Sequence, residues 1–347
     1  MSSTSTAARE LPRPGVTPRR SVLESPARAW LTYVAAMALT LAPMLILSGD
    51  NYWINIITLA YLFGGLATAW NIIGGFGGQF SAAHGVFFGF GAYFTARLYL
   101  DGGVSPWISM PIGGVLAAVI AVLISWPTFR LRGPFFAIAT MAFNEVAAVF
   151  ANYFSSVTGG AQGILVPFRA GFKNMIFVQR WQYALLMFGF LALTVLVSIV
   201  IRRSRLGYYL LAVREDEDTA RAAGVNVLAV KLWGMAISAL LTGMGGSLFT
   251  MLIRFIDPPT LFSLPDVGIK FALIALIGGI GTIYGSLLGA ALVVPLENYI
   301  RATLGGTWPG AHLVVLGALL MLTALFLRRG IVGSFTRALP RWRARRA

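Results

Sequence analysis

Five ionisable side chains interrupt the apolar runs of this sequence. Arg97, Glu145, Lys270 and Glu297 lie within such runs, and His84 lies near the boundary of one. An ionised group is costly in hydrocarbon, so each is expected to face protein or water, and each is a functional hypothesis by default. Glu145, in ATMAFNEVAAVF, is the most deeply placed. It could line a substrate path, carry protons or bond a neighbouring helix.

The other charges in these runs have simpler explanations. Arg97 and Glu297 lie near the ends of their runs, where a long side chain can reach the interface. Lys270, four residues into a run, could pair with an acid or extend outward. A proton-coupled carrier would need a relay of several carboxylates or histidines, and only Glu145 and Glu297 qualify. This argues against an ion-coupled secondary transporter, which is the alternative function from a different class of membrane protein.

No catalytic or metal-binding constellation is recognisable. The chain has no cysteine, and its two histidines, His84 and His312, are too few and too separated to suggest a metal site. The serine in GGSLF lacks identifiable histidine and acid partners, and the acidic run 215–218 falls in a polar segment. Neither glycine-rich segment ends in the Lys-Ser/Thr of a phosphate loop. We therefore expect no catalytic residue, no metal and no cofactor bound by this chain.

The composition places these residues in a membrane protein. Hydrophobic residues make up 57% of the 347 positions and charged residues 11%, which is far from the composition of a soluble domain. The length suits about ten spans of roughly 20 residues each, with short connections. We predict an all-α polytopic membrane protein with one integral domain in the lipid bilayer.

The net charge of +15 follows the positive-inside rule. Twenty of the 27 basic residues lie in four polar segments, 1–28, 127–133, 202–231 and 326–347. No soluble module with interleaved aromatic residues accompanies them, so we expect cytoplasmic loops and tails rather than a nucleic-acid partner.

Hydropathy predicts ten membrane spans. The apolar runs cover 29–47, 53–73, 80–99, 107–126, 134–152, 181–201, 232–253, 266–279, 285–299 and 310–327. The stretch 266–299 could form one tilted helix, for nine spans, but ten spans place both termini in the cytoplasm. The chain then divides into a disordered basic tail (1–28), a membrane domain (29–328) and a second basic tail (329–347).

Glycines cluster where the runs meet, in 74–91 and in 278–289. Gly281, Gly285 and Gly289 are spaced four apart, which would put them on one helix face where another backbone can approach closely. We interpret them as helix-packing residues.

The most polar interruption is RRSRLGYYLLAVREDEDTARAAGVN (202–226), in a predicted cytoplasmic loop over 202–230. Asp216 or Asp218 is a candidate N-cap for a short alanine-rich helix, and Gly224 is a candidate stop. Four acids at the helix start suit its positive dipole end. A short amphipathic helix exposed to the cytosol is a docking element; the alternative is a merely solvated connector.

Several ordered segments together resemble one family. They are GGFGGQFSAAHGVFFGFGAYFTA, RGPFFAIATMAFNEV, TGGAQGI, RSRLGYYLLAVREDEDTARAAGVNV with the following KLWGMAISALLTGMGGSLF, and IALIGGIGTIYGSLLGA. Over about 50–327, the chain resembles the permease subunits of branched-chain amino acid ABC importers, in their LivM-like branch. It departs from the usual pattern at Ala83, which is commonly glycine, and in the additional Asp257, Pro259 and Lys270.

The resemblance implies a transport subunit without ATPase activity in the bacterial cytoplasmic (inner) membrane. It implies a heterodimer with a second related permease, two cytoplasmic ATPase subunits that bind ATP and Mg²⁺, and an extracytoplasmic substrate-binding protein. The matching loop would be the coupling helix that nucleotide-driven closure moves. The residues carried over to that role are Glu215, Asp216, Asp218, Ala220, Arg221, Ala222, Ala223 and Gly224.

Substrate and pathway stay more open. The implied substrates are branched-chain or other hydrophobic amino acids; relatives of similar pattern import urea, amides or aromatic acids. The polar residues nearest a possible pathway are Asn71, Gln79, His84, Asn144 and Glu145. For each of them a structural hydrogen bond is the competing explanation.

Overall fold

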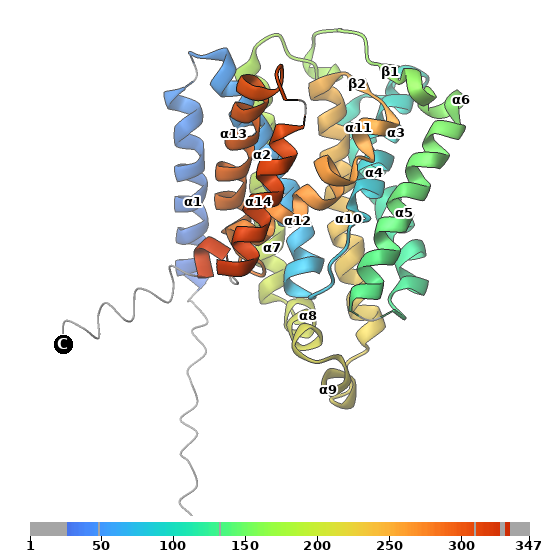
Figure 1. Cartoon of the computed structure of the whole chain (residues 1–347), viewed down its shortest axis with the longest axis vertical. Coiled ribbons are helices and arrows are strands. Elements are labelled where there is room, and N and C mark those ends of the chain that lie inside the picture. Colours follow the sequence, from blue (N-terminus) through green and yellow to red (C-terminus); the bar gives the residue numbers. More distant parts are fainter. Residues whose placement is uncertain (1–25, 48, 132, 309, 327–329, 334–347) are drawn as a thin grey trace, which may run out of the picture.

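Helices make up almost the whole computed structural model, which describes residues 26–47, 49–131, 133–308, 310–326 and 330–333 (Figure 1). The long helices of the first half are α1 (Pro26–Ile46), α2 (Asn51–Asn71), α3 (His84–Leu100), α4 (Pro106–Thr128) and α5 (Pro134–Tyr153). Those of the second half are α7 (Arg180–Arg203), α10 (Val227–Ile253), α12 (Ile269–Gly279), α13 (Gly285–Leu304) and α14 (Ala311–Phe326). The chain is therefore an all-α polytopic membrane protein, as predicted.

Each of the ten predicted apolar runs overlaps one of these ten helices, of which α12 is the shortest, with 11 residues. In the described part of the chain, seven helical stretches are long and apolar enough to cross a membrane: Asn51–Phe76, Pro106–Thr128, Pro134–Tyr153, Arg180–Arg203, Val227–Ile253, Pro258–Gly279 and Gly285–Leu304. Shorter apolar helices cover Trp30–Ile46 and Ala311–Thr323. The predicted tails lie outside the described residues over 1–25 and 334–347.

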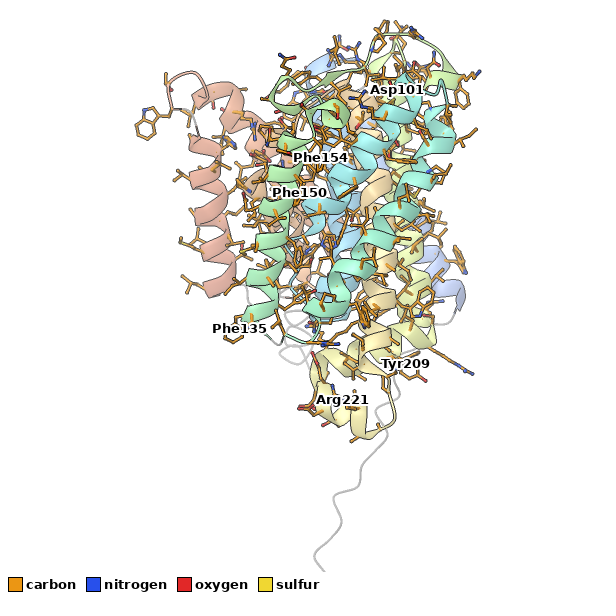
Figure 2. The ribbon with its side chains drawn as sticks, turned by 90° about the vertical axis from the view of Figure 1, so that its right-hand side faces the viewer. Asp101, Phe135, Phe150, Phe154, Tyr209 and Arg221 are labelled. Carbon is orange, nitrogen blue, oxygen red and sulfur yellow. The ribbon has the colours of Figure 1, made fainter. Side chains whose placement is uncertain are left out.

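Short elements occupy the two ends of the bundle (Figure 1). At one end lie α6 (Ser155–Thr158), α11 (Pro258–Leu261) and the antiparallel strands β1 (Ile164–Leu165) and β2 (Phe255–Ile256). At the other end lie α8 (Arg205–Glu215) and α9 (Glu217–Ala222). Phe135, just after the basic segment 127–133, lies toward the same end as Tyr209 and Arg221 (Figure 2). Two of the predicted cytoplasmic segments thus share one end, as the positive-inside rule requires.

The centre of the bundle is α2. Leu62, Leu66 and Trp70 are fully buried, and α2 packs against α7, α10, α12 and α13. A helix that is apolar on every side suits such a position, since it has no face to present to water. It continues into a π-helical turn, Ile72–Phe76, whose residues are also buried.

Contacts between backbones hold the helices around α2 together. A Cβ placed on Gly246 of α10 would lie 2.0 Å from the carbonyl oxygen of Phe88 in α3, so only glycine allows this approach. A Cβ on Gly289 of α13 would lie 2.0 Å from the carbonyl oxygen of Ile274 in α12. Small residues permit such packing in lipid, where burying apolar side chains gives no advantage.

The predicted glycine face needs one correction. Gly285 begins α13 and, like Gly289, lies against α12. Gly281 lies in the preceding turn with a φ of +75°, in the left-handed region that favours glycine. The expectation that all three share a helix face was wrong for Gly281, because the chain reverses between α12 and α13 instead of continuing as one helix.

We expect Gly289→Ala to lower the thermal midpoint of the detergent-purified protein, because the new methyl group meets backbone that cannot move away. The expected cost is about 1–3 kcal/mol, as for other overpacked sites. Gly317→Ala in α14 is the matched control, since nothing lies within 4 Å of its Cβ position. Equal midpoints for the two variants would contradict the backbone contact.

Candidate functional site

Two short helices, α8 and α9, form the polar element between α7 and α10 (Figure 1). Only one helix is predicted here from the sequence, so α8 is an additional helix. Ser204 caps α8 by accepting a hydrogen bond from the Gly207 amide, at 3.4 Å. Leu206, Leu210 and Val213 follow at helical spacing, and the last two are buried. That i, i+4, i+7 pattern was the signal that could have predicted the helix.

The helix α9 has the predicted start and stop. Asp216 is the N-cap, and its carboxylate accepts a hydrogen bond from the Thr219 amide at 2.5 Å. Gly224 has a φ of +84°, and the Val225 amide reaches back to the Ala220 carbonyl at 3.0 Å. This six-to-one bond closes a Schellman motif. Asp218, the alternative cap, instead pairs with Arg221 on the surface at 2.9 Å.

A buried ion pair fastens α9 to the membrane helices. Glu217 pairs with Lys231 of α10, whose side chain is 1% exposed. The same carboxylate oxygen accepts a hydrogen bond from Gln79, at 3.3 Å. The Lys231 ammonium also lies 5.6 Å from the centre of the Phe129 ring. One acid therefore joins α9 both to α10 and to the loop that follows α2.

A second connection runs through Arg214 of α8. Its guanidinium donates to the Gly75 carbonyl at 2.8 Å and lies against Gly281. Gly281 in turn donates its amide to Asn71 at 2.8 Å, and Asn71 donates to the Thr282 carbonyl at 2.8 Å. The polar element thus touches both glycine-rich turns, 72–78 through a hydrogen bond and 280–284 through the close approach of Arg214 to Gly281.

The exposed side of α9 carries small side chains and is accessible. Ala222, Ala223 and Gly224 are exposed, whereas Ala220 is buried against its own chain. Glu215 is exposed at the last position of α8. A hollow of about 380 Å³ beside them is lined by Leu206, Tyr209, Ala223, Gly224, Val225, Asn226, Ala229, Val230 and Trp233. This surface is therefore open to a partner, because small exposed residues lie beside a hollow and no large side chain covers them.

Three of the five predicted pathway residues are fully buried. His84 contacts the Ser81 hydroxyl at 3.2 Å and the Ser238 hydroxyl at 2.8 Å, and Ser238 donates to the Ala69 carbonyl. Asn144 donates to the Phe262 carbonyl at 2.6 Å. Asn71 bonds Gly281 and Thr282, and Gln79 bonds Glu217. Four of the five side chains thus form hydrogen bonds within the protein.

Glu145 is different, because its side chain is exposed on α5. The expectation that it is deeply buried was wrong: Asn144 faces inward, which turns its neighbour outward. The exposed residues of α5 recur at helical spacing and are Pro134, Phe135, Ile138, Ala142, Glu145, Val146, Val149, Phe150, Asn152 and Tyr153. Figure 2 shows Phe135 near one end of this helix and Phe150 toward the other. The α5 face is thus apolar except for the Glu145 carboxylate and, next to the end of the helix, the Asn152 amide.

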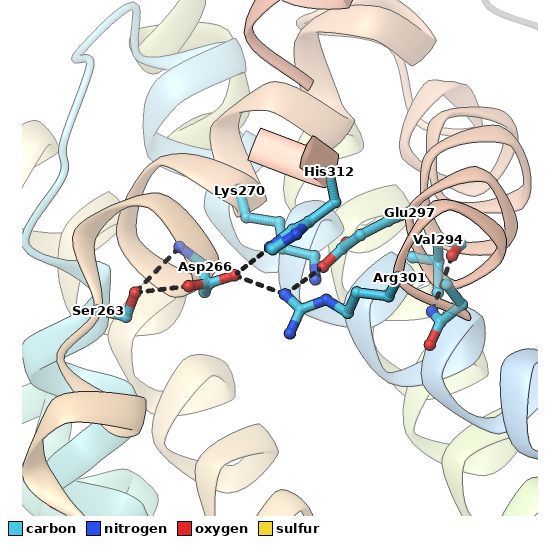
Figure 3. Close-up of polar contacts among 8 residues, drawn as sticks. Ser263, Asp266, Lys270, Val294, Glu297, Arg301 and His312 are labelled. Atoms are coloured by element: carbon cyan, nitrogen blue, oxygen red, sulfur yellow. Dashed lines mark hydrogen bonds and ion pairs between the residues drawn. The ribbon is translucent and has the colours of Figure 1, made fainter. Parts of the chain in front are cut away.

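An ion-pair cluster that was not predicted from the sequence joins α12, α13, α14 and the segment before α12 (Figure 3). Lys270 of α12 pairs with Glu297 of α13 at 2.6 Å, and both are buried. Arg301 bonds Glu297 at 2.9 Å and Asp266 at 2.8 Å. His312 of α14 lies 3.8 Å from Asp266. Of the two alternatives for Lys270, pairing with an acid is the observed one.

The cluster does not suit a resident metal. Ligand atoms of Asp266, Glu297 and His312 lie within 4.8 Å of one another. Both carboxylates, however, already pair with cations. A divalent ion there would face the positive charges of Lys270 and Arg301 at short range.

We expect Glu217→Ala to destabilise the protein by about 3 kcal/mol, because it leaves the buried Lys231 ammonium unpaired. Asp218→Ala is the matched control on the same helix, where the Arg221 pair is exposed and contributes about 0–1 kcal/mol. Thermal unfolding in detergent measures both. The anchoring role would be rejected by equal losses in the two variants.

Comparison with known proteins gives a consistent set of matches. The family described as "Branched-chain amino acid transport system / permease component" matches residues 52–324. The chain is 28% identical to the high-affinity branched-chain amino acid permease LivM of Escherichia coli, over 87% of this chain and 74% of that protein. It is 28% identical to LivH of the same organism, over 80% of this chain and 94% of LivH.

A more distant match is the probable LivM of Methanocaldococcus jannaschii, at 24% identity over 60% of this chain and 64% of that protein. No solved structure matches the chain.

Proposed function

Because the chain belongs to the family of branched-chain amino acid permease components, we propose that it forms half of the membrane pathway of an ABC importer. A second, related permease supplies the other half, and the similarity to both LivM and LivH supports such a two-permease assembly. Two cytoplasmic ATPases bind ATP and Mg²⁺, and an extracytoplasmic binding protein delivers a branched-chain or other hydrophobic amino acid. The chain itself catalyses no reaction.

The observation that carries this proposal is the way in which α8 and α9 are anchored. An element that merely connected two spans would need no buried ion pair. Here Glu217 joins α9 to α10, and Arg214 joins α8 to the turns at both glycine-rich segments. A displacement of α9 by closing ATPases would therefore reach several membrane helices together, as a rigid lever between two states of the pathway.

The same assignment sets the orientation. The end that carries α8 and α9 faces the cytoplasm of a bacterial inner membrane, and the end with β1 and β2 faces outward. Both termini then lie in the cytoplasm. The binding protein docks on the outer end, over the connections 154–179 and 254–263.

We expect Ala222→Trp to abolish co-purification with the ATPase subunits, because a bulky ring on the exposed face of α9 blocks its seat. The residue is exposed, so the fold should be unaffected. Ala161→Trp, exposed at the opposite end, is the matched control and should retain the ATPases. Co-expression of the four subunits followed by affinity purification measures this. Full retention in Ala222→Trp would refute the coupling role.

The α5 face is our candidate for the surface that lines the pathway. Glu145 is the twelfth of twenty residues in this apolar helix and is exposed. A charge at that depth is not stable against lipid, so protein or water must cover it in the assembly. The second permease, meeting α5 across a wet pathway, provides both.

The absence of native cysteine allows a direct test of the α5 face. We expect Glu145→Cys in the assembled transporter to react with a membrane-impermeant, water-soluble thiol reagent, because water reaches this face. Val119→Cys in α4, also exposed and mid-helix, should stay unreactive because it faces lipid. Mass spectrometry of the labelled chain measures both. An inert Glu145→Cys would remove α5 from the pathway.

A further inference from the structure

The outer half of the bundle contains a pocket with two chemically different walls. It has a volume of about 360 Å³ and lies between α2, α3, α10, α12 and α13. One wall carries the ion-pair cluster of Asp266, Lys270, Glu297 and Arg301. The rest of the lining includes the aliphatic and aromatic side chains of Leu59, Phe63, Phe88, Phe249 and Ile253, and the Lys270 ammonium lies 3.9 Å from the centre of the Phe63 ring. Pockets that take small ligands are of this size and contain a few polar groups among apolar ones.

The charges of the polar wall balance. Two carboxylates and two cations form the polar wall. A ligand with a net charge would therefore leave that charge uncompensated, whereas a zwitterionic ligand carries no net charge. The positive and negative ends of the polar wall lie close together, because Arg301 bonds both Asp266 and Glu297 through the same nitrogen, Nη2. A ligand with its own adjacent ammonium and carboxylate matches this arrangement.

The Arg301 guanidinium also has a nitrogen that donates no hydrogen bond within the cluster. In the part of the chain that the structure describes, the Arg301 Nη1 has no hydrogen-bond partner, and Figure 3 shows no contact at this nitrogen. The Arg301 side chain is 48% exposed and that of Asp266 36%, whereas Lys270 and Glu297 are almost fully buried. A ligand carboxylate can therefore reach the guanidinium, and a ligand ammonium can reach Asp266, without breaking the buried pair.

From this geometry we propose that the pocket binds a free α-amino acid with an apolar side chain. Its carboxylate pairs with Arg301, its ammonium with Asp266, and its side chain lies on the wall of Phe63, Phe249 and Ile253. Lys270 and Glu297 hold the two contacting groups in place. Urea and simple amides lack the paired charges that this wall offers.

The inference rests on the proposed function for one step only, namely that the end with α11 and β2 is the side from which substrate arrives. The Asp266 and Lys270 segment directly follows α11, which lies at that end (Figure 1). The pocket then stands where an amino acid released by the binding protein enters the permease.

The test is ligand binding to the purified full-length chain in nanodiscs, measured by saturation-transfer difference NMR. Leucine should bind saturably. Its two single-charge analogues, 3-methylbutylamine and 4-methylpentanoate, should each bind about tenfold or more weakly, the effect of losing one charge-assisted hydrogen bond. Urea should not compete. Analogues that bind as well as leucine, or no saturable binding of leucine up to its solubility, would overturn the site.

Variants of the pocket residues test whether leucine binds at this site. Arg301→Gln and Asp266→Asn should each weaken leucine binding about tenfold or more. Arg97→Gln is the matched control: Arg97 is also a half-exposed arginine near a helix end, but it bonds the Ser156 and Val157 carbonyls instead. Unchanged binding in the first two variants would refute the proposal. The analogue series needs no variant, so it decides the question even if a variant fails to fold.

The two proposals can fail separately. The binding assay contains neither ATPase nor binding protein, whereas the Ala222→Trp experiment reports only ATPase association. Leucine binding without ATPase association would remove the importer assembly and leave the pocket. ATPase association without zwitterion preference would remove the pocket and leave the importer.

Discussion

Pairing of polar groups away from water is the constraint on which this structure depends. In a helical bundle within lipid, a polar group that finds no partner in the protein costs several kcal/mol. His84 meets this demand through Ser81 and Ser238. Asn144 meets it in part: its amide nitrogen donates to the Phe262 carbonyl, while its buried Oδ1 has no partner among the described residues. The His84–Ser238 and Asn144–Phe262 contacts join elements far apart in the sequence, so these polar residues help to determine which helices are neighbours.

The same constraint makes the polar element between α7 and α10 mechanically useful. Lys231 is buried and requires an acid, and Glu217 on α9 is the acid it finds. Because breaking such a pair would strand a buried charge, α9 cannot move independently of α10. Arg214 likewise connects α8 to the turn that follows α2, through Gly75, and to the turn between α12 and α13, where it lies against Gly281. A force on α9 is thereby delivered to the centre of the bundle and not absorbed in a flexible loop.

Two places in the described structure leave charge open to a partner. Glu145 is exposed on an apolar helix, and Arg301 and Asp266 are half-exposed above a buried ion pair. By contrast, Arg97, Lys231 and Lys270 are each bonded to groups of the protein itself. Uncompensated or accessible charge at membrane depth is expensive, so these two places are where a second subunit, water or substrate is expected to complete the structure. They lie on different elements, and both belong to the proposed route of the amino acid.

Much of the architecture was contained in the sequence. Ten apolar runs predicted ten long helices, because only a helix satisfies its own backbone in hydrocarbon. Asp216 and Gly224 predicted the limits of α9, because caps are interactions between residues a few positions apart. Ordered motifs over most of the chain predicted the family.

The side on which each polar residue faces was decided only by tertiary structure. Glu145 was expected inside and lies outside, and Glu297 was expected near the interface and is buried, because both positions depend on neighbouring helices. Gly281 lies in a turn and not on the expected helix face, and there its amide donates a hydrogen bond to Asn71 of α2. Gln79 and Glu217 meet across 138 positions of sequence. Local periodicity carries no information about such pairs, since they exist only once the helices have packed.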